Sequence, residues 1–234
     1  QRPALILAPN TILHKMDKNL PAELAVMFNP LGAGFRWAVE IPQTQVGDTV
    51  LIFGPGQRGL ASVVAAREAG AGKIIVTGLA ADSKKLQMAL ALGADHIIDV
   101  QNENVVDRVR ALTNGKGADV IVEVTSYATQ PVREALDCVR MGGTVVLAGV
   151  KGFKPVSDFV SDLIVMKEIT IKGAIGVTSS GYKKAIEMIE RRKYPLELMH
   201  THNFELEEAE LAIKTLARQI EGRESVHSCL IPAT

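Results

Sequence analysis

The chain has 234 residues, 47% of them hydrophobic, and its 26 lysines and arginines balance 26 aspartates and glutamates. A chain of this length forms one large domain or one domain together with part of another. The balanced charge provides neither the basic field of a nucleic-acid-binding protein nor a polybasic patch for a membrane surface, and no apolar run reaches the ~20 residues of a membrane span.

From Val46 onward, short runs of β-branched residues alternate with stretches of helical character. We expect strands at Thr49–Phe53, Lys73–Thr77, His96–Ile98, Ala118–Val124, Thr144–Ala148 and Ile169–Gly173. The helices between them are expected at Leu60–Ala69, Ser83–Leu92, Val105–Leu112, Gln130–Val139 and Ser157–Met166. Asp82 or Ser83 suits a helix N-cap, and Gly70, Gly93 and Gly142 sit where helices should stop.

The expected strands are apolar nearly throughout, as in 120–124 (VIVEV) and 145–149 (VVLAG). Such strands suit a parallel sheet that is covered on both faces. Regular alternation of strand and helix requires parallel crossovers of one handedness. We therefore predict an α/β fold with a doubly wound, six-stranded parallel sheet of the Rossmann type.

The pattern differs at both ends of the chain. After Gly176 we expect helices at Tyr182–Arg192 and Glu207–Ile220 and strands at Met199–Phe204 and Val226–Ile231. Near the start, Ala4–Leu7 and Ile12–Leu13 read as short strands without a sheet of their own. These parts are not further strand–helix repeats.

The segment 50–59 (VLIFGPGQRG) places three glycines at G-x-G-x-x-G spacing between an apolar strand and a helix. The first glycine allows a tight turn, the second lets the backbone approach a pyrophosphate, and the third lets the helix pack close to the strand. The helix then directs free N–H groups at the anion. We predict a dinucleotide site at Gly54, Pro55, Gly56, Gln57, Arg58 and Gly59, and the alternative is an ordinary tight turn.

Six segments, the first of which contains the glycine loop, follow one another in a fixed order, and the resemblance that they carry covers almost everything from Pro21 to Pro232. They read VGDTVLIFGPGQRG, LGADHIIDV, GKGADVIVEV, ALDCVRMGGTVVLAG, ITIKGAIG and FELEEAELAI. In this order they resemble the medium-chain dehydrogenase/reductase superfamily, specifically its zinc-type alcohol dehydrogenase-like branch.

The resemblance implies three parts. Residues 1–30 would be the tail of an N-terminal catalytic domain, most of which this chain does not contain. Residues 31–175 would form the NAD(P)-binding Rossmann domain, and residues 176–234 would return to the catalytic domain. The missing part is where the family keeps its zinc ligands and most of its substrate pocket.

The resemblance also implies an oxidoreductase that moves hydride between the nicotinamide of NAD or NADP and a small-molecule alcohol or carbonyl substrate. No residue of this chain stands out as a catalytic acid, base or metal anchor, so we expect the chain alone to be inactive. Two other classes are open: a sensor or scaffold module that binds NAD(P) without catalysis, and a methyltransferase that binds S-adenosylmethionine. The complete glycine triad argues against the second.

Polyol-dehydrogenase relatives carry Glu-Pro-Leu where this chain has Asn29, Pro30 and Leu31, and that glutamate lies at the catalytic metal. An amide is a poorer zinc ligand than a carboxylate. We therefore predict no bound zinc in this chain.

The residue that selects between NAD and NADP is expected about 20 residues after the glycines, at the end of the second strand. The family's acidic position there falls on Gly78. Without a carboxylate, nothing repels a 2′-phosphate, and Lys84 and Lys85 lie just downstream. This favours NADP, although Asp82 can accept from the ribose or cap the next helix, and the two lysines can equally lie on the helix surface.

Ligands of open parallel sheets bind at the carboxyl ends of the strands. Thr125 and Ser126 follow the fourth strand, and Gly149 and Val150 follow the fifth. In the family these loops, with Ala174 to Gly176, flank the nicotinamide and its ribose. Glu123, in the fourth strand, either orients a loop or is a satisfied core carboxylate.

His227 occupies a place where relatives have an arginine or lysine that reaches the pyrophosphate. His200 and His202 form an H-x-H pair that is expected on one side of a strand. They can hold a metal, but no third ligand is near them in sequence, so structural hydrogen bonding is the preferred interpretation. Lys151 can steer phosphate or substrate, but a solvated loop residue is the preferred interpretation.

The two cysteines, Cys138 and Cys229, lie far apart, which favours reduced thiols and a cytoplasmic location. Relatives pair the strand corresponding to 169–173 across a two-fold axis. An apolar edge strand invites such pairing, so we predict a homodimer through this strand.

Overall fold

A computed structural model describes residues 7–232. Its centre is a sheet of six parallel strands in the order β3-β2-β1-β4-β5-β6. The strands are β1 (Thr49–Phe53), β2 (Lys73–Gly78), β3 (His96–Asp99), β4 (Ala118–Glu123), β5 (Val139–Leu147) and β6 (Thr170–Gly173). The predicted Rossmann sheet is thus confirmed. The strand order reverses between β1 and β4, so the switch point of the sheet lies between these two strands.

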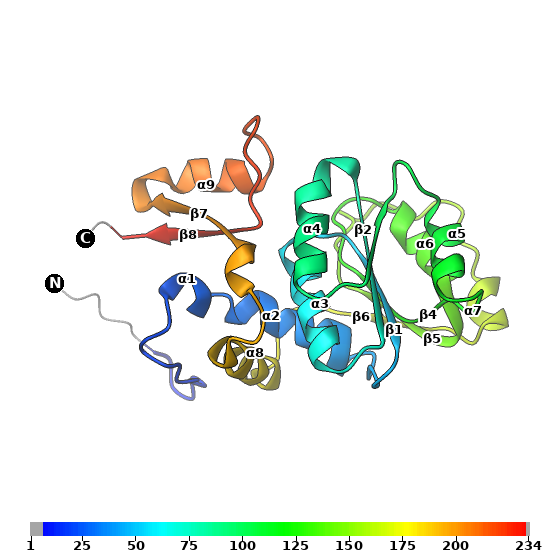
Figure 1. Ribbon diagram of the computed structural model, residues 1–234, viewed down its shortest axis with the longest axis horizontal. Helices are drawn as coiled ribbons and strands as arrows, with labels where there is room; N and C mark the ends of the chain where they lie inside the picture. The colour runs from blue at the N-terminus through cyan, green and yellow to red at the C-terminus, as the bar shows by residue number, and fades with distance from the viewer. Residues whose placement is uncertain (1–6, 233–234) are drawn as a thin grey trace.

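Helices cover both faces of this sheet, as Figure 1 shows with α3 and α4 on one side and α5 and α6 on the other. These helices are α3 (Gln57–Glu68), α4 (Ser83–Ala91), α5 (Val105–Leu112), α6 (Gln130–Cys138) and the short α7 (Asp162–Met166). Side chains alternate between the faces along β1. Val50 and Ile52 join the core under α3, whereas Leu51 and Phe53 join the core under α5 and α6.

A helical segment that the sequence did not predict precedes the sheet. It consists of α1 (Ala22–Ala25), α2 (Phe28–Phe35) and a π-helical continuation, η1 (Arg36–Glu40). A Cβ at Gly34 would overlap the backbone of Ala61, so α2 and α3 approach each other closely. The boundary predicted between residues 30 and 31 falls within α2, and the division into domains stays a prediction.

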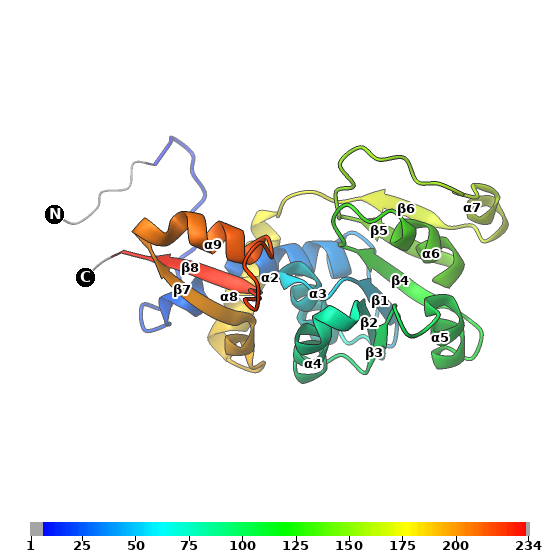
Figure 2. The same cartoon turned by 90° about the horizontal axis from the view of Figure 1, so that it is seen from above.

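The C-terminal part forms a separate small unit at one end of the molecule in both views (Figures 1 and 2). It contains α8 (Ser179–Arg191), η3 (Leu196–Met199), β7 (His200–Glu205), η4 (Leu206–Glu208), α9 (Ala209–Leu216) and β8 (His227–Ile231). Strands β7 and β8 pair in parallel, and α8 packs on α2. Glu68 at the end of α3 accepts from Lys193 and Tyr194, which ties this unit to the Rossmann part.

Several expected boundaries are wrong. Ile12–Leu13 is not a strand, and most of the expected strand Ala4–Leu7 lies outside the described residues. Gly142 lies inside β5, which begins at Val139, and so it does not end a helix. The helix expected from Ser157 begins only at Asp162. Among residues 7–232, no helix has the length and apolar character required to cross a membrane.

Candidate functional site

The turn between β1 and α3 carries the glycine motif at the carboxyl edge of the sheet. Gly54 has a φ of +103°, and its N–H donates to the carbonyl of Thr77 at the end of β2. Gly56 precedes α3, and no side chain of the described residues caps this helix. The first-turn amides of α3 are therefore available to an anion, which the helix dipole also favours.

Two glycines of this turn differ in what a Cβ would meet there. A Cβ at Gly59 would overlap the carbonyl oxygen of Gly54, so only glycine lets α3 pack this close to the turn. A Cβ at Gly56 would meet no described atom within 4 Å. Gly56 therefore presents bare backbone to open space, as a surface that receives phosphate groups must.

A pocket of about 250 Å³ opens beside this turn. Its lining comes from α2, η1, the start of α3, the loops after β5 and β6, and α8: Asn29, Trp37, Arg58, Ala148, Val150, Ala174, Ile175, Gly176, Val177 and Tyr182. The guanidinium carbon of Arg58 lies 5.0 Å from the centroid of the Trp37 ring, within cation–π range. Four predicted cofactor residues, Arg58, Val150, Ala174 and Gly176, thus meet around one cavity.

The side chains around this pocket do not fit a zinc ion. Asn29 donates its side-chain N–H to the Tyr182 hydroxyl at 3.0 Å. Within residues 7–232, no three histidine, cysteine or carboxylate side chains converge on the pocket. A zinc ion has no set of ligands here, since such sites use imidazole, thiolate and carboxylate groups.

A buried ion pair holds the loops after β4 and β5 together. Glu123 is 0% exposed, and its Oε1 accepts from the N–H and the hydroxyl of Thr125. Its Oε2 lies 2.8 Å from Nζ of Lys151, which also donates to the Thr125 carbonyl. The expectation of a solvated Lys151 is therefore wrong, because its ammonium group neutralises the buried carboxylate.

This pair positions two of the predicted cofactor residues. The Thr125 hydroxyl is hydrogen-bonded to the side chains of Glu123 and Lys151. A Cβ at Gly149 would overlap the Thr125 carbonyl oxygen. Ser126 is exposed and, like Thr125 and Gly149, lines neither pocket. Glu123 is both a satisfied core carboxylate and the residue that orients the loop.

The end of β2 has no room for a carboxylate. A Cβ at Gly78 would lie 2.8 Å from Cγ of Pro55 and 3.1 Å from a methyl carbon of Leu86. Pro55, the second residue of the glycine loop, thus occupies the space that a longer side chain would need. Pro55 and Gly78 are brought together, and the ribose-binding acid is absent from its expected position.

Asp82 is buried and its carboxylate is fully engaged. Oδ1 pairs with Arg218 and lies 3.6 Å from Nζ of Lys85, and Oδ2 accepts from the N–H of Leu79. Burial lowers the pKa of Lys85, with Arg218 adding to the effect. Asp82 is the N-cap residue of α4, as predicted, but its side chain makes no capping hydrogen bond to that helix, and Lys85 is not on the helix surface. Nothing in the sequence marked Arg218 as the partner.

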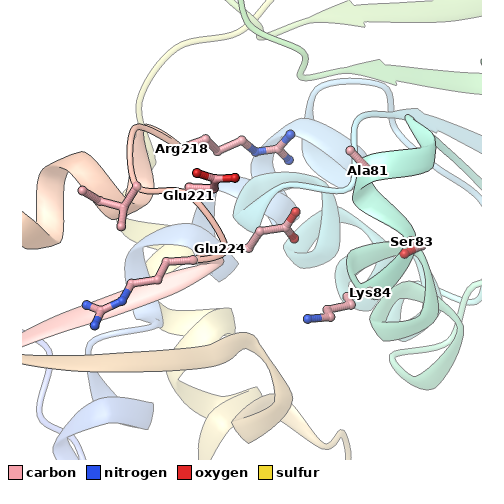
Figure 3. Close-up of a pocket in the computed structure, with 9 residues that line it drawn as sticks. Ala81, Ser83, Lys84, Arg218, Glu221 and Glu224 are labelled. Atoms are coloured by element: carbon pink, nitrogen blue, oxygen red, sulfur yellow. The ribbon is translucent and has the colours of Figure 1, made fainter.

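A second pocket, of about 360 Å³, lies between the start of α4 and the segment that joins α9 to β8 (Figure 3). It is lined by Ala81, Ser83, Lys84, Arg218, Ile220, Glu221, Gly222, Arg223 and Glu224. Lys84 is exposed and makes no ion pair with a described residue. Glu221 and Glu224 also extend toward the cavity, so cations and carboxylates share its wall.

His227 lines neither pocket. It is buried on β8, and its Nδ1 lies 3.1 Å from Nδ1 of His200 on β7. Burial, followed by the neighbouring His200, lowers the pKa of His227. Gln57, which begins α3, also lines neither pocket. The pyrophosphate role of both residues stays a prediction.

The comparison of this chain with known proteins gives consistent results. A family model described as zinc-binding dehydrogenase matches residues 59–191. A probable alcohol dehydrogenase of Mycobacterium tuberculosis is 40% identical over 97% of this chain and 62% of its own length. An erythritol/L-threitol dehydrogenase of Mycolicibacterium smegmatis is 32% identical over 98% of this chain and 61% of its own length.

Solved structures agree with this result. An alcohol dehydrogenase from Thermotoga maritima superposes with a TM-score of 0.83 at 28% identity, over 94% of this chain and 60% of that one. An alcohol dehydrogenase from Thermus sp. ATN1 gives a TM-score of 0.82 at 25% identity, over 93% and 61%. The chain thus spans about three-fifths of the length of these relatives.

Proposed function

Because the chain belongs to the zinc-binding dehydrogenase family, we propose that it holds the nicotinamide dinucleotide of an alcohol or carbonyl oxidoreductase. The observation that carries this proposal is the turn from β1 to α3. It presents bare backbone at Gly56 and an uncapped helix start, and a pocket opens beside it. A pyrophosphate bound at this turn would place one nucleotide of the cofactor on each side of the switch point of the sheet.

In this proposal the first-turn amides of α3 bind the pyrophosphate, and Arg58 adds positive charge beside them. The pocket lined by Trp37, Ala174 and Gly176 receives the nicotinamide. When bound, this ring supplies the chemistry, which is hydride transfer at C4. The chain's own residues bind and orient it, and the Glu123–Lys151 pair keeps the adjoining loops in place.

The activity of the whole protein is part of the proposal, since the chain covers only 62% of its mycobacterial relative. The described residues provide no zinc ligands at the nicotinamide pocket, so the chain alone is expected not to turn over substrate. We assign the Rossmann role to residues 31–175 and a catalytic-domain role to 1–30 and 176–234. Two free cysteines support a cytoplasmic location.

We further propose that the cofactor is NADP. Gly78 carries no carboxylate and has no space for one, and Asp82 is already paired with Arg218 and Lys85. Lys84, at the second pocket, is the lysine that remains available to a 2′-phosphate. Glu221 and Glu224 oppose this attraction, so the preference is expected to be modest.

Trp37 offers a direct test, because it is the only tryptophan of the chain and lines the proposed nicotinamide pocket. Titration with NADPH should quench its emission and excite the reduced nicotinamide by energy transfer, and S-adenosylmethionine should do neither. The proposal would be contradicted if neither NADPH nor NADH, added to saturation, changed the Trp37 emission or produced a heat of binding.

The cofactor preference is tested with Lys84→Gln. This substitution should weaken the binding of NADPH roughly tenfold, as expected for the loss of one charge-assisted contact, and leave the binding of NADH unchanged. Lys116→Gln, at an exposed lysine between α5 and β4, is the matched control and should change neither. Tighter binding of NADH than of NADPH by the unmodified chain would overturn the assignment of NADP.

A further inference from the structure

His200, His227 and Cys229 form a cluster between β7 and β8. One ring nitrogen of each histidine and the sulfur of Cys229 all lie within 4.8 Å of one another. No residue of this cluster lines either of the two pockets. The cluster therefore lies apart from both pockets.

The register of the two strands builds this cluster. His200 is paired with His227, and Cys229 follows two residues later on the same strand. Residues two apart on a strand share a face, so the two histidines and the cysteine lie on one face of the pair. A shift in register between His200 and His202 then places His202 opposite Ser228.

This shift overturns the expected H-x-H arrangement. Because Ser228 lies on the other face from His227 and Cys229, His202 is separated from His200. His202 instead stacks on Phe204, with ring centroids 5.7 Å apart. The third ligand that seemed missing from the sequence comes from β8, more than 20 residues after His200.

The distances suit a tetrahedral site. Zinc binds imidazole at about 2.0–2.1 Å and thiolate at about 2.3 Å, which sets nitrogens about 3.3 Å apart and nitrogen and sulfur about 3.6 Å apart. The two Nδ1 atoms lie 3.1 Å apart, in the kind of structural hydrogen bond predicted for His200, which a bound ion would replace. The donor atoms of all three side chains lie within 4.8 Å of one another.

The chemistry of the cluster suits the same ion. His227 is buried, and His200 and Cys229 are half-buried, so the three donor atoms are partly shielded from water. Imidazole nitrogen and thiolate sulfur are both zinc ligands.

In place of the prediction that this chain binds no zinc, we propose that His200, His227 and Cys229 bind one borderline-soft divalent cation of the Zn²⁺ type and thereby fasten β7 to β8. Two imidazoles and one thiolate are ligands that Zn²⁺ prefers, and calcium or magnesium, which take oxygen ligands, are disfavoured. The fourth position is left for a water molecule. The site lines neither the pocket beside Asn29 nor the pocket beside Lys84.

The test uses Co²⁺ as the probe, because zinc gives no spectrum. The purified chain, stripped with a chelator, should bind one Co²⁺ with the strong visible bands of a tetrahedral ion and a near-ultraviolet band from thiolate to cobalt. Added Zn²⁺ should abolish both and raise the melting temperature. The absence of both bands at excess Co²⁺ would refute the site.

Variants identify the ligands. Cys229→Ser should lose the thiolate band and bind Co²⁺ at least tenfold more weakly, and His200→Gln should weaken binding similarly. His202→Gln and Cys138→Ala are the matched controls and should retain both bands, since His202 lies on the other face and burial raises the pKa of Cys138 to about 12. A thiolate band that survives in Cys229→Ser would overturn the proposal. The circular-dichroism spectrum of each variant reports its folding, and NADPH binding is measured in parallel as an independent property.

Discussion

We expect substitutions of Gly56 and Gly59 to affect different properties, cofactor affinity and stability respectively, although both glycines belong to one motif. Gly59→Ala introduces a Cβ onto the Gly54 carbonyl oxygen, so α3 must move and the free energy of unfolding should fall by about 1–3 kcal/mol. Gly56→Ala meets no described atom, so stability should hold while NADPH affinity falls at least tenfold.

Chemical denaturation and cofactor titration of both variants separate these effects. Gly173→Ala, at an exposed glycine of β6 that also has nothing within 4 Å, is the matched control and should change neither quantity. Normal NADPH affinity in Gly56→Ala would show that phosphates do not rest on this turn.

The Glu123–Lys151 pair predicts a large effect on stability. Lys151→Met leaves a carboxylate that is 0% exposed without its counter-ion, which should cost about 3–5 kcal/mol in the free energy of unfolding. The double variant Glu123→Gln with Lys151→Met removes both charges and should recover much of the loss. Urea denaturation of the three proteins checks this, and equal stabilities of the single and double variants would contradict it.

Residue-level prediction succeeded where a role depends on neighbours in sequence and failed where it depends on distant partners. The glycine spacing alone placed the turn correctly. Asp82 could not be interpreted without Arg218, which lies 136 residues later and carries no motif. Lys151 was misjudged for the same reason, because its partner Glu123 belongs to a different strand.

The elements of the Rossmann part were predicted closely because strand and helix periods are local properties. The helix α2 was missed because its sequence, FNPLGAGF, contains a proline and two glycines, which have low helix propensity. Packing against α3 and α8 stabilises it, and this packing is invisible in the sequence. The register shift in β7 was equally unpredictable, since it depends on pairing with β8.

The pairing of β7 with β8 makes stability depend on pH through His227. Its pKa in the folded chain lies below the ordinary 6.5, because burial and His200 disfavour the charged ring. The unfolded chain therefore binds a proton more readily, and the free energy of unfolding should fall as the pH drops through about 6.5. His227→Gln should show a shallower decline than the unmodified chain in metal-free buffer. Urea denaturation between about pH 8 and 5.5 measures this. An equal decline in the free energy of unfolding of the variant and of the unmodified chain would contradict the prediction.

At the scale of the whole molecule, the open edge of the sheet predicts association. β6 is the edge strand, and the apolar side chains of Val165, Met166 and Ile175 near it are exposed. Unpaired backbone with exposed apolar neighbours favours a two-fold dimer. Light scattering at micromolar concentration should give twice the chain mass, and Thr170→Asp, at an exposed position of this strand, should shift it toward the monomer. A monomeric mass for the unmodified chain would exclude this interface.

The C-terminal unit and the Rossmann part meet at both pockets. Tyr182 of α8 contributes to the pocket beside Trp37, and Arg218 contributes to the pocket beside Lys84. The sequence predicted Lys84 and the strand-end loops of these pockets but not Tyr182, Trp37 or Arg218, because the contribution of these three residues arises only when α2, α8 and α9 pack against the sheet. Cofactor recognition is therefore a property of the assembled chain.

The central claim is that a dinucleotide rests on the turn between β1 and α3. A crystal structure of the chain with NADPH tests it most directly. The account predicts the pyrophosphate within hydrogen-bond distance of the amides of Gln57 and Arg58, with the nicotinamide beside Trp37. A cofactor bound elsewhere, or a turn that stays empty at saturating NADPH, would contradict it.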